Sequence, residues 1–266
     1  MRTFTTSPAT ENPPNGNSGK KTPSGVLWRW GAVAFWLVVW QLGSLALGQP
    51  LLLPSPAAVA VRLGRLAATL PFWQVVLGSL GRILGGFVLG FLGGGLLAVA
   101  GSRWRWVYHL AALPLGVVKA TPVASFAILA LLFLRDGWFS AAIAMLMVLP
   151  LAFDNITAGI AAVDSRLLEM TRVFAFSPMR RLRWLWWPTL LPHLATAARV
   201  GLGFAWKAGV AAEVIAIPAN AIGTQLYNAK VTLETADLFA WTVVIIILSL
   251  LLEKGLARLL QPKGGR

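Results

Sequence analysis

The chain has 266 residues, of which 57% are hydrophobic and 12% charged, and its mean hydropathy of +0.72 excludes a soluble domain of ordinary composition. Its formal charge of +14 comes from 23 Lys and Arg against 9 Asp and Glu. Because the positive charges cluster between apolar runs, they indicate contact with anionic membrane lipid, and no nucleic-acid partner is expected. The absence of cysteine excludes disulfides, thiolate metal sites and cysteine nucleophiles.

The first 72 residues read as a tail, a span and an external loop. Residues 1–25 are rich in Ser, Thr, Asn, Pro and Gly, which predicts a disordered cytoplasmic tail. Residues 26–47 form an apolar run longer than the roughly 7–15 residues of a secretory signal core, so a retained first transmembrane helix is predicted. Residues 48–72 hold QPLLLPSP and then AAVAVRLGRLAATL, which predicts an external loop with a short amphipathic helix.

Residues 73–260 are predicted to form a five-helix core. The expected spans are 73–100, 107–134 with interruptions at Pro114 and Pro122, 138–160, 189–217 and 238–260. Residues 219–237 are polar enough to predict a loop, and residues 261–266 form a basic tail. The predicted fold class is therefore an all-α membrane protein with six transmembrane helices.

The distribution of Lys and Arg predicts the orientation of these helices. One set of connections carries most of these charges, including Arg103, Arg105 and the arginines of residues 164–188. The other side has fewer, namely Arg62, Arg65 and Arg82, then Arg135 beside Asp136, and Lys230 diluted by Glu234 and Asp237. Tryptophans also gather on the basic side, as at Trp184. Both termini and residues 164–188 are therefore predicted to be cytoplasmic in a multi-pass protein of the bacterial inner membrane.

Residues 164–188 interrupt the apolar sequence with a compact charged segment. Asp164 or Ser165 can cap one short helix, and Ser177 followed by Pro178 is typical of a second helix start. Two capped helices outside the membrane predict a rigid protrusion, whereas a connecting loop needs only a few residues. The alternative is an interfacial helix that rests on anionic headgroups.

The stretch EMTRVFAFSPMRRLRWLWWP resembles the cytoplasmic EAA motif of type I ABC importer permeases, in which Glu-Ala-Ala is followed after three residues by Gly and after nine more by Ile-x-Leu-Pro. Glu169 and Pro188 match at the expected separation and Leu185 replaces isoleucine. Met170, Thr171, Ala175 and Trp187 depart from the motif. The resemblance extends over residues 70–260 through SLGRILGGFVLG, KATPVASFAILALLF, AGIAAVDSRLLEM and WKAGVAAEVIA, and this pattern is most similar to the nitrate, sulfonate and taurine branch.

The resemblance implies a permease fold with a coupling helix between helices 4 and 5 that docks into a separate ATPase subunit. The residues that it assigns to this coupling are Leu168, Glu169, Met170, Thr171, Phe174, Ala175, Ser177, Pro178, Arg180 and Arg181. Because alanine replaces the motif glycine at 175, the first short helix is predicted to run further toward Pro178. The implied partners are two ABC ATPase subunits, a second permease subunit identical to this one, and an extracytoplasmic substrate-binding protein.

Charged residues inside the predicted spans indicate a translocation path. A charge near the bilayer centre costs at least about 2.5 kcal/mol, so it faces a cavity or a partner. Lys119 lies beside Pro122, where a broken helix can border a lumen, and Lys207 and Glu213 lie six residues apart in the fifth span and cannot pair on one face. These four residues are the predicted path residues, and the lysines favour an anionic substrate. The alternative is that each lysine neutralises Glu213, Asp154 or a backbone carbonyl.

Glycines in the second span repeat at four-residue intervals as Gly86, Gly90 and Gly94, with Gly81 and Gly85 beside them. Such rows permit close helix contact and are assigned to packing inside one subunit.

The sequence lacks the elements that catalysis would require. It has no Walker-type glycine loop, no paired catalytic carboxylates and no metal-ligand spacing, so no enzyme activity and no cofactor are expected, and ATP is expected to bind the partner ATPase. The rival function is a secondary transporter driven by an ion gradient. Such proteins usually contain internal repeats and clusters of intramembrane acids, which are not seen here.

Overall fold

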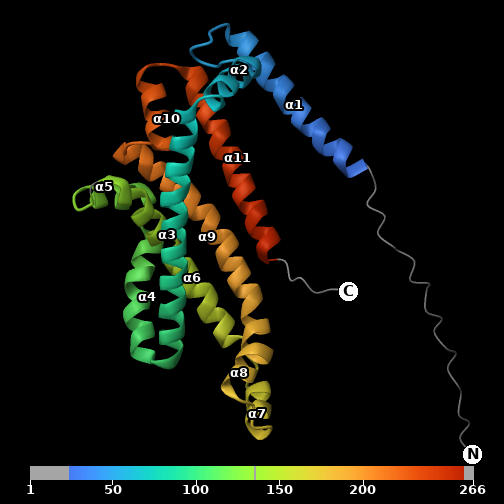
Figure 1. The fold of residues 1–266 in the computed structure, drawn as a ribbon, viewed down its shortest axis with the longest axis vertical. Helices are drawn as coiled ribbons and strands as arrows, with labels where there is room; N and C mark the ends of the chain where they lie inside the picture. The colour runs from blue at the N-terminus through green and yellow to red at the C-terminus, as the bar shows by residue number, and fades with distance from the viewer. Residues whose placement is uncertain (1–23, 135, 261–266) are drawn as a thin grey trace, which may run out of the picture.

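The computed structural model describes residues 24–134 and 136–260, and every regular element in these ranges is helical (Figure 1). The helices are α1 (Ser24–Leu47), α2 (Pro56–Ala67), α3 (Leu70–Arg103), α4 (Arg105–Ala120), α5 (Val123–Leu131), α6 (Phe139–Ala161), α7 (Ser165–Val173), α8 (Pro178–Arg181), α9 (Trp187–Ala216), α10 (Ile222–Val231) and α11 (Thr235–Leu260), with a 3₁₀ turn at Asp136–Trp138 and a π-helical turn at Leu182–Trp186. The predicted basic tail and most of the predicted N-terminal tail lie outside the described residues. The all-α fold class is confirmed.

By length and composition alone, fewer than six of these helices are able to span a membrane. Trp30–Leu47 within α1, α3, α6 and α11 are each long and apolar enough to span a membrane, and α4 with α5 makes a fifth span if the bent pair crosses once. The 30-residue α9 is not in this group because Arg199, Lys207 and Glu213 lower its hydropathy. The chain is thus a multi-pass membrane protein, and the six-span count stays a prediction.

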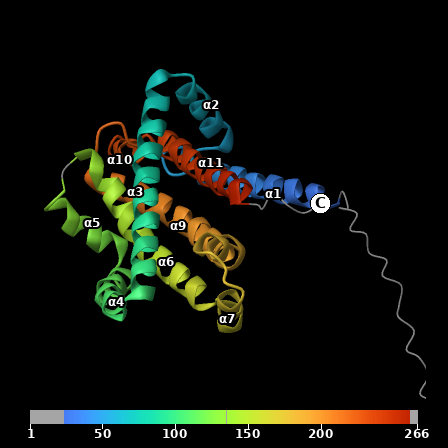
Figure 2. The same ribbon diagram turned by 60° about the horizontal axis from the view of Figure 1, so that its bottom comes forward.

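Helix α3 forms the centre of the bundle and packs along α6, with α9 against both (Figures 1 and 2). The row Gly86, Gly90 and Gly94 lies on the buried face of α3, and a Cβ at Gly90 would lie 2.5 Å from the carbonyl oxygen of Met145. Only glycine permits this approach of the two backbones. The row therefore packs within the subunit as predicted, whereas Gly81 and Gly85 face open space.

The predicted third span is broken once. Pro114 lies inside α4 without ending it, so the interruption expected there is wrong. The helix ends at Ala120, and Thr121 is extended, as the residue before a proline usually is. Pro122 is the N-cap of α5, which runs at 104° to α4. Helix α5 consequently turns out from the bundle axis, as both views show (Figures 1 and 2).

The end of the bundle formed by α2 and α10, called the α10 end below, is closed by polar contacts between distant segments. Arg62 of α2 binds the two carboxylate oxygens of Asp237 of α11 through its Nε and Nη2. In addition, Thr235 donates a hydrogen bond to the carbonyl of Leu51, and Trp40 of α1 donates one to the carbonyl of Pro54. Beyond this junction α1 leads away from the bundle (Figure 1).

Residues 219–237 contain helix α10, so the prediction of a loop over this range is wrong. The helix was not evident because its surface is polar and its N-cap, Ala221, offers no side-chain hydrogen bond. It follows a tight connection in which Ile217 and Asn220 adopt left-handed backbone conformations, with φ of 50° and 52°. Its N-terminus is held by residues of α3 and α9 that lie more than a hundred positions apart in the sequence.

Candidate functional site

Helices α7 and α8 form a protrusion at the end of the bundle opposite α10 (Figure 1). The Asp164 carboxylate accepts a hydrogen bond of 2.8 Å from the Arg166 amide, and the Ser177 hydroxyl accepts one of 3.4 Å from the Arg180 amide. These are the two helix caps expected from the sequence. Helix α8 passes through the π-helical turn directly into α9, so a displacement of α8 is carried into a core helix.

The surface of this protrusion, residues 164–183, combines apolar and charged side chains that the rest of the chain does not cover. In α7 only Thr171 is buried; its hydroxyl donates to the Leu168 carbonyl, and its own carbonyl accepts from the Phe176 amide. The side chain of Glu169 is exposed. The exposed large apolar residues of the protrusion are Leu167, Met170, Val173, Phe174, Met179 and Leu182. Arg180 lies over the Phe176 ring at 5.4 Å.

The turn between α7 and α8 contradicts the longer first helix predicted from Ala175. Helix α7 ends at Val173, and Ala175 adopts a left-handed conformation with φ of 52°. An L-residue with a Cβ is disfavoured there, and glycine is the residue that adopts it freely. The backbone therefore keeps the conformation that suits the motif glycine, because the Ala175 amide bonds the Arg172 carbonyl and Pro178 starts the next helix.

Of the predicted path residues, Lys119 is paired. Its Nζ donates a hydrogen bond of 2.7 Å to the Asp154 carboxylate of α6, and the two side chains are 45% and 46% exposed. This pairing agrees with the alternative in which a lysine neutralises Asp154. Pro122, three residues after Lys119, is exposed and immediately precedes α5. A charged pair that is half exposed on a membrane helix bundle needs water or another protein surface beside it.

Lys207 is exposed on α9 and has no ion-pair partner among the described residues. Val200, Phe204 and Ala211 are exposed on the same side of α9, at helical spacing from Lys207. The stripe faces away from α3 and α6, against which the opposite side of α9 packs. A lone lysine on such a stripe cannot face lipid without a large cost.

Glu213 is fully buried and belongs to a network that the sequence did not reveal. Its carboxylate accepts hydrogen bonds from the Ser79 hydroxyl at 2.7 Å, from Arg82 Nη2 at 3.0 Å and from the Gly223 amide at 3.3 Å. Arg82 also donates to the carbonyl of Asn220 at 2.8 Å. No hydrogen bond or ion pair joins Glu213 to Lys119 or Lys207 within the described ranges, so the predicted path residues do not form one cluster.

The missed partner, Arg82, did carry a signal in the sequence. It follows Gly81 inside the second apolar span, whereas the charge distribution groups it with the connections of the outer side. An arginine and a glutamate that both lie in apolar spans are expected to neutralise each other, because each is costly alone. The sequence therefore indicated that Arg82 and Glu213 could pair, but it did not indicate the geometry of the pair.

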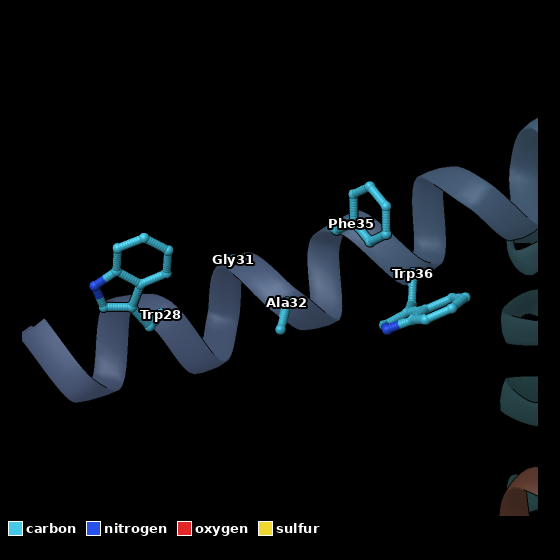
Figure 3. Close-up of a pocket in the computed structure, with 5 residues that line it drawn as sticks. All are labelled: Trp28, Gly31, Ala32, Phe35 and Trp36. Atoms are coloured by element: carbon cyan, nitrogen blue, oxygen red, sulfur yellow. The ribbon is translucent and has the colours of Figure 1, made fainter.

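A shallow hollow on α1 is apolar. It is lined by Trp28, Gly31, Ala32, Phe35 and Trp36, whose rings extend from the surface of that one helix (Figure 3). It contains no charged or metal-binding group. Over residues 24–134 and 136–260, no group of three or more His, Asp or Glu side chains could hold a metal ion.

Comparison with known proteins gives a consistent result. The family of binding-protein-dependent transport system inner membrane components matches residues 75–263. The riboflavin transport system permease protein RibX of Chloroflexus aurantiacus is 29% identical over 84% of this chain and 86% of its own length. The taurine transport system permease protein TauC of Escherichia coli is 28% identical over 87% and 90%. A solved structure of the inward-facing MetNI methionine ABC transporter has a TM-score of 0.53 at 18% identity, and covers 71% of this chain and 92% of that one.

Proposed function

Since the chain belongs to the family of binding-protein-dependent transport system inner membrane components, we propose how it works as the permease subunit of an ABC importer. Two ABC ATPases bind the protrusion of α7 and α8, a second copy of this chain completes the path, and an extracytoplasmic binding protein delivers the solute. The carried solute is small and anionic. The observation that carries the proposal is the capped, exposed protrusion that continues directly into α9.

The protrusion suits a joint with another protein better than contact with lipid headgroups. Val173 and Phe174 are 82% and 66% exposed, so the rest of the described chain does not cover them. Helix α7, at whose end they lie, is at the end of the bundle opposite α10 (Figure 1). Exposed Glu169 and the flanking arginines can pair across such a joint. Because α8 leads into α9 without a flexible linker, a push on the joint moves a core helix.

The proposed orientation follows the distribution of positive charge. The α7 end carries the arginines of the protrusion together with Arg103 and Arg105 at the turn between α3 and α4, and is cytoplasmic. The α10 end is then the outer end, and both termini are cytoplasmic. Helix α9 is counted as the sixth span: packed between α3, α6 and α11, it can carry charges that a lipid-exposed helix cannot.

The path and its selectivity are proposed from the lysines. Lys207 has no partner in the described chain and faces away from the core, so it lies on the path or at the contact with the second copy. Lys119 beside the break at Pro122 is neutralised by Asp154 and adds no net charge to the path. Taurine, the solute in the name of TauC, carries an anionic sulfonate, whereas riboflavin, the solute in the name of RibX, is uncharged. The unpaired Lys207 favours the first class.

The joint is tested by co-purification. The chain is expressed with the ATPase encoded beside it, and recovery of the ATPase is compared between wild type and a Glu169→Lys variant. We expect recovery of the ATPase to fall at least about tenfold. The substitution removes the carboxylate that pairs with the ATPase and adds a positive charge beside the arginines of the protrusion. Lys230→Glu, an exposed charge reversal on α10 at the opposite end of the bundle, is the control and should leave recovery unchanged. Equal recovery from all three chains would remove Glu169 from the joint.

A further inference from the structure

We propose that Glu213, Arg82 and Ser79 form an outer latch that seats α10 on α3 and α9 and opens during the transport cycle. The assignment of the α10 end to the outer side rests on the proposed function. The three residues act as positioning residues for α10, and Glu213 is not in contact with the solute. The inference begins from how the first turn of α10 is satisfied.

The N-terminus of α10 is capped by residues from other helices. Its own N-cap residue, Ala221, has no side chain that can accept a hydrogen bond. The amide of Ile222 instead donates to the Ser79 hydroxyl at 2.9 Å, and the amide of Gly223 donates to the Glu213 carboxylate at 3.3 Å. A carboxylate at this position also meets the positive end of the helix dipole. The first turn of α10 is therefore complete only while it rests on α3 and α9.

The seat is narrow and specific. A Cβ at Gly223 would collide with the Cβ of Glu213 and the amide of Val214, so the backbone of α10 lies directly on α9. Arg82 closes the other side by bonding both the Glu213 carboxylate and the carbonyl of Asn220. Because two of these interactions are charge-assisted, removing them releases both the helix and the connection that precedes it.

The connection from α9 to α10 is conformationally strained. Ile217 is a β-branched residue with φ of 50° and ψ of 50°, a region that such residues rarely adopt. Asn220 has φ of 52° three residues later. Strained backbone persists where its surroundings hold it, and here the network holds residue 220 directly. Loss of the network therefore favours departure of α10 from its seat.

The latch also borders the outward-turned helix α5. Residues 216–219 line a hollow together with Leu131 and Leu134 at the end of α5 and Phe139 at the start of α6. A movement of the connection therefore changes the shape of this hollow, which borders the half of the broken span that follows Pro122.

The test uses the absence of cysteine from the chain, which makes a single introduced thiol the only label site in it. Ala221→Cys places that thiol at a fully buried position in the latch. The whole transporter complex is placed in right-side-out membrane vesicles, and labelling of this chain by a membrane-impermeant maleimide is timed. With Arg82→Gln and Glu213→Gln added together, labelling should become at least about tenfold faster, because the closed state loses its charged contacts.

Three comparisons separate a latch from general loosening. The pair Arg62→Gln and Asp237→Asn removes the other ion pair of the same end and should leave the labelling rate unchanged. Arg82→Lys keeps the charge but loses the guanidinium that bonds both Glu213 and Asn220, so its labelling rate should lie between those of the parent and the doubly neutral variant. ATP enclosed within the vesicles, on the side of the ATPases, should speed labelling of the parent but not of the Arg82→Gln, Glu213→Gln chain, a difference that a merely structural contact would not produce.

The proposal is overturned if the doubly neutral variant labels at the parental rate, if the control pair accelerates labelling equally, or if ATP changes both chains alike. ATP-dependent uptake by the parent is measured in the same vesicles. Its absence would contradict the proposed function separately, while the comparison of labelling rates without ATP would still report on the latch.

Discussion

Lys119 Nζ lies 2.7 Å from the Asp154 carboxylate although nearly half of each side chain is exposed, so α4 and α6 are joined by a charged pair on an open face of the bundle. Beside it the broken span turns by 104° at Pro122. A pair in this position is stable only if water or a second protein surface lies against it. The pair therefore marks a face of the subunit that lipid does not cover.

A double-mutant cycle measures this pair. We expect Lys119→Met and Asp154→Asn each to lower thermal stability in detergent by about 1 kcal/mol, because each leaves an unpaired charge that solvent partly screens. The combined variant should cost no more than either single change. Additive losses in thermal unfolding would show that the two side chains do not interact in the assembled protein.

Lys207 is predicted to select the charge of the solute. Lys207→Met should lower uptake of a small sulfonate about tenfold, since a positive group that faces the path is lost, while Lys207→Arg should retain most of it. The measurement is ATP-dependent uptake of labelled taurine in vesicles, with ATPase recovery as the control for assembly. Unchanged uptake by the methionine variant would exclude Lys207 from the path.

The left-handed conformation of Ala175 predicts a stabilising substitution. Ala175→Gly should raise the free energy of unfolding by up to about 1 kcal/mol, because glycine adopts φ near 50° without strain. Ala60→Gly, at an exposed helical position of α2, is the matched control and should cost up to about 1 kcal/mol. Thermal unfolding of the purified chain checks both, and a loss of stability in Ala175→Gly would contradict the observed turn.

The glycine rows of α3 predict opposite outcomes at nearby positions. Gly90→Ala should destabilise the protein by about 1–3 kcal/mol, since its Cβ would push against the backbone of α6 at Met145. Gly85→Ala faces open space and should be neutral or slightly stabilising. Equal melting temperatures for the two variants would show that the close contact of α3 and α6 is absent.

Much of the fold was accessible from the sequence because the relevant signals are local. Apolar runs indicated the long helices, and Asp164 and Ser177 indicated the caps of α7 and α8. The motif around Glu169 indicated the family. What could not be read depends on tertiary contact: α10 has no cap in its own sequence, and Pro114 fits inside α4 without ending it.

The candidate site shows the same division. Lys119 and Lys207 could be identified because a charge in an apolar span is rare. The sequence does not indicate, however, which way each lysine side chain points. Glu213 was assigned to the path on the same ground, whereas the structure places it in a buried network with Arg82 and Ser79. The conformation of Ala175 was missed because helix propensity was applied to a position where the surrounding turn decides.

Reconstitution in sealed vesicles tests the central claim, that this chain is moved by a separate ATPase acting through α7 and α8. The chain is reconstituted alone, and in parallel with its ATPase and binding protein, and solute accumulation is followed with ATP or with an imposed proton or sodium gradient. We predict accumulation only in the complete complex and only with ATP. Uphill accumulation by the chain alone on an ion gradient would contradict the account.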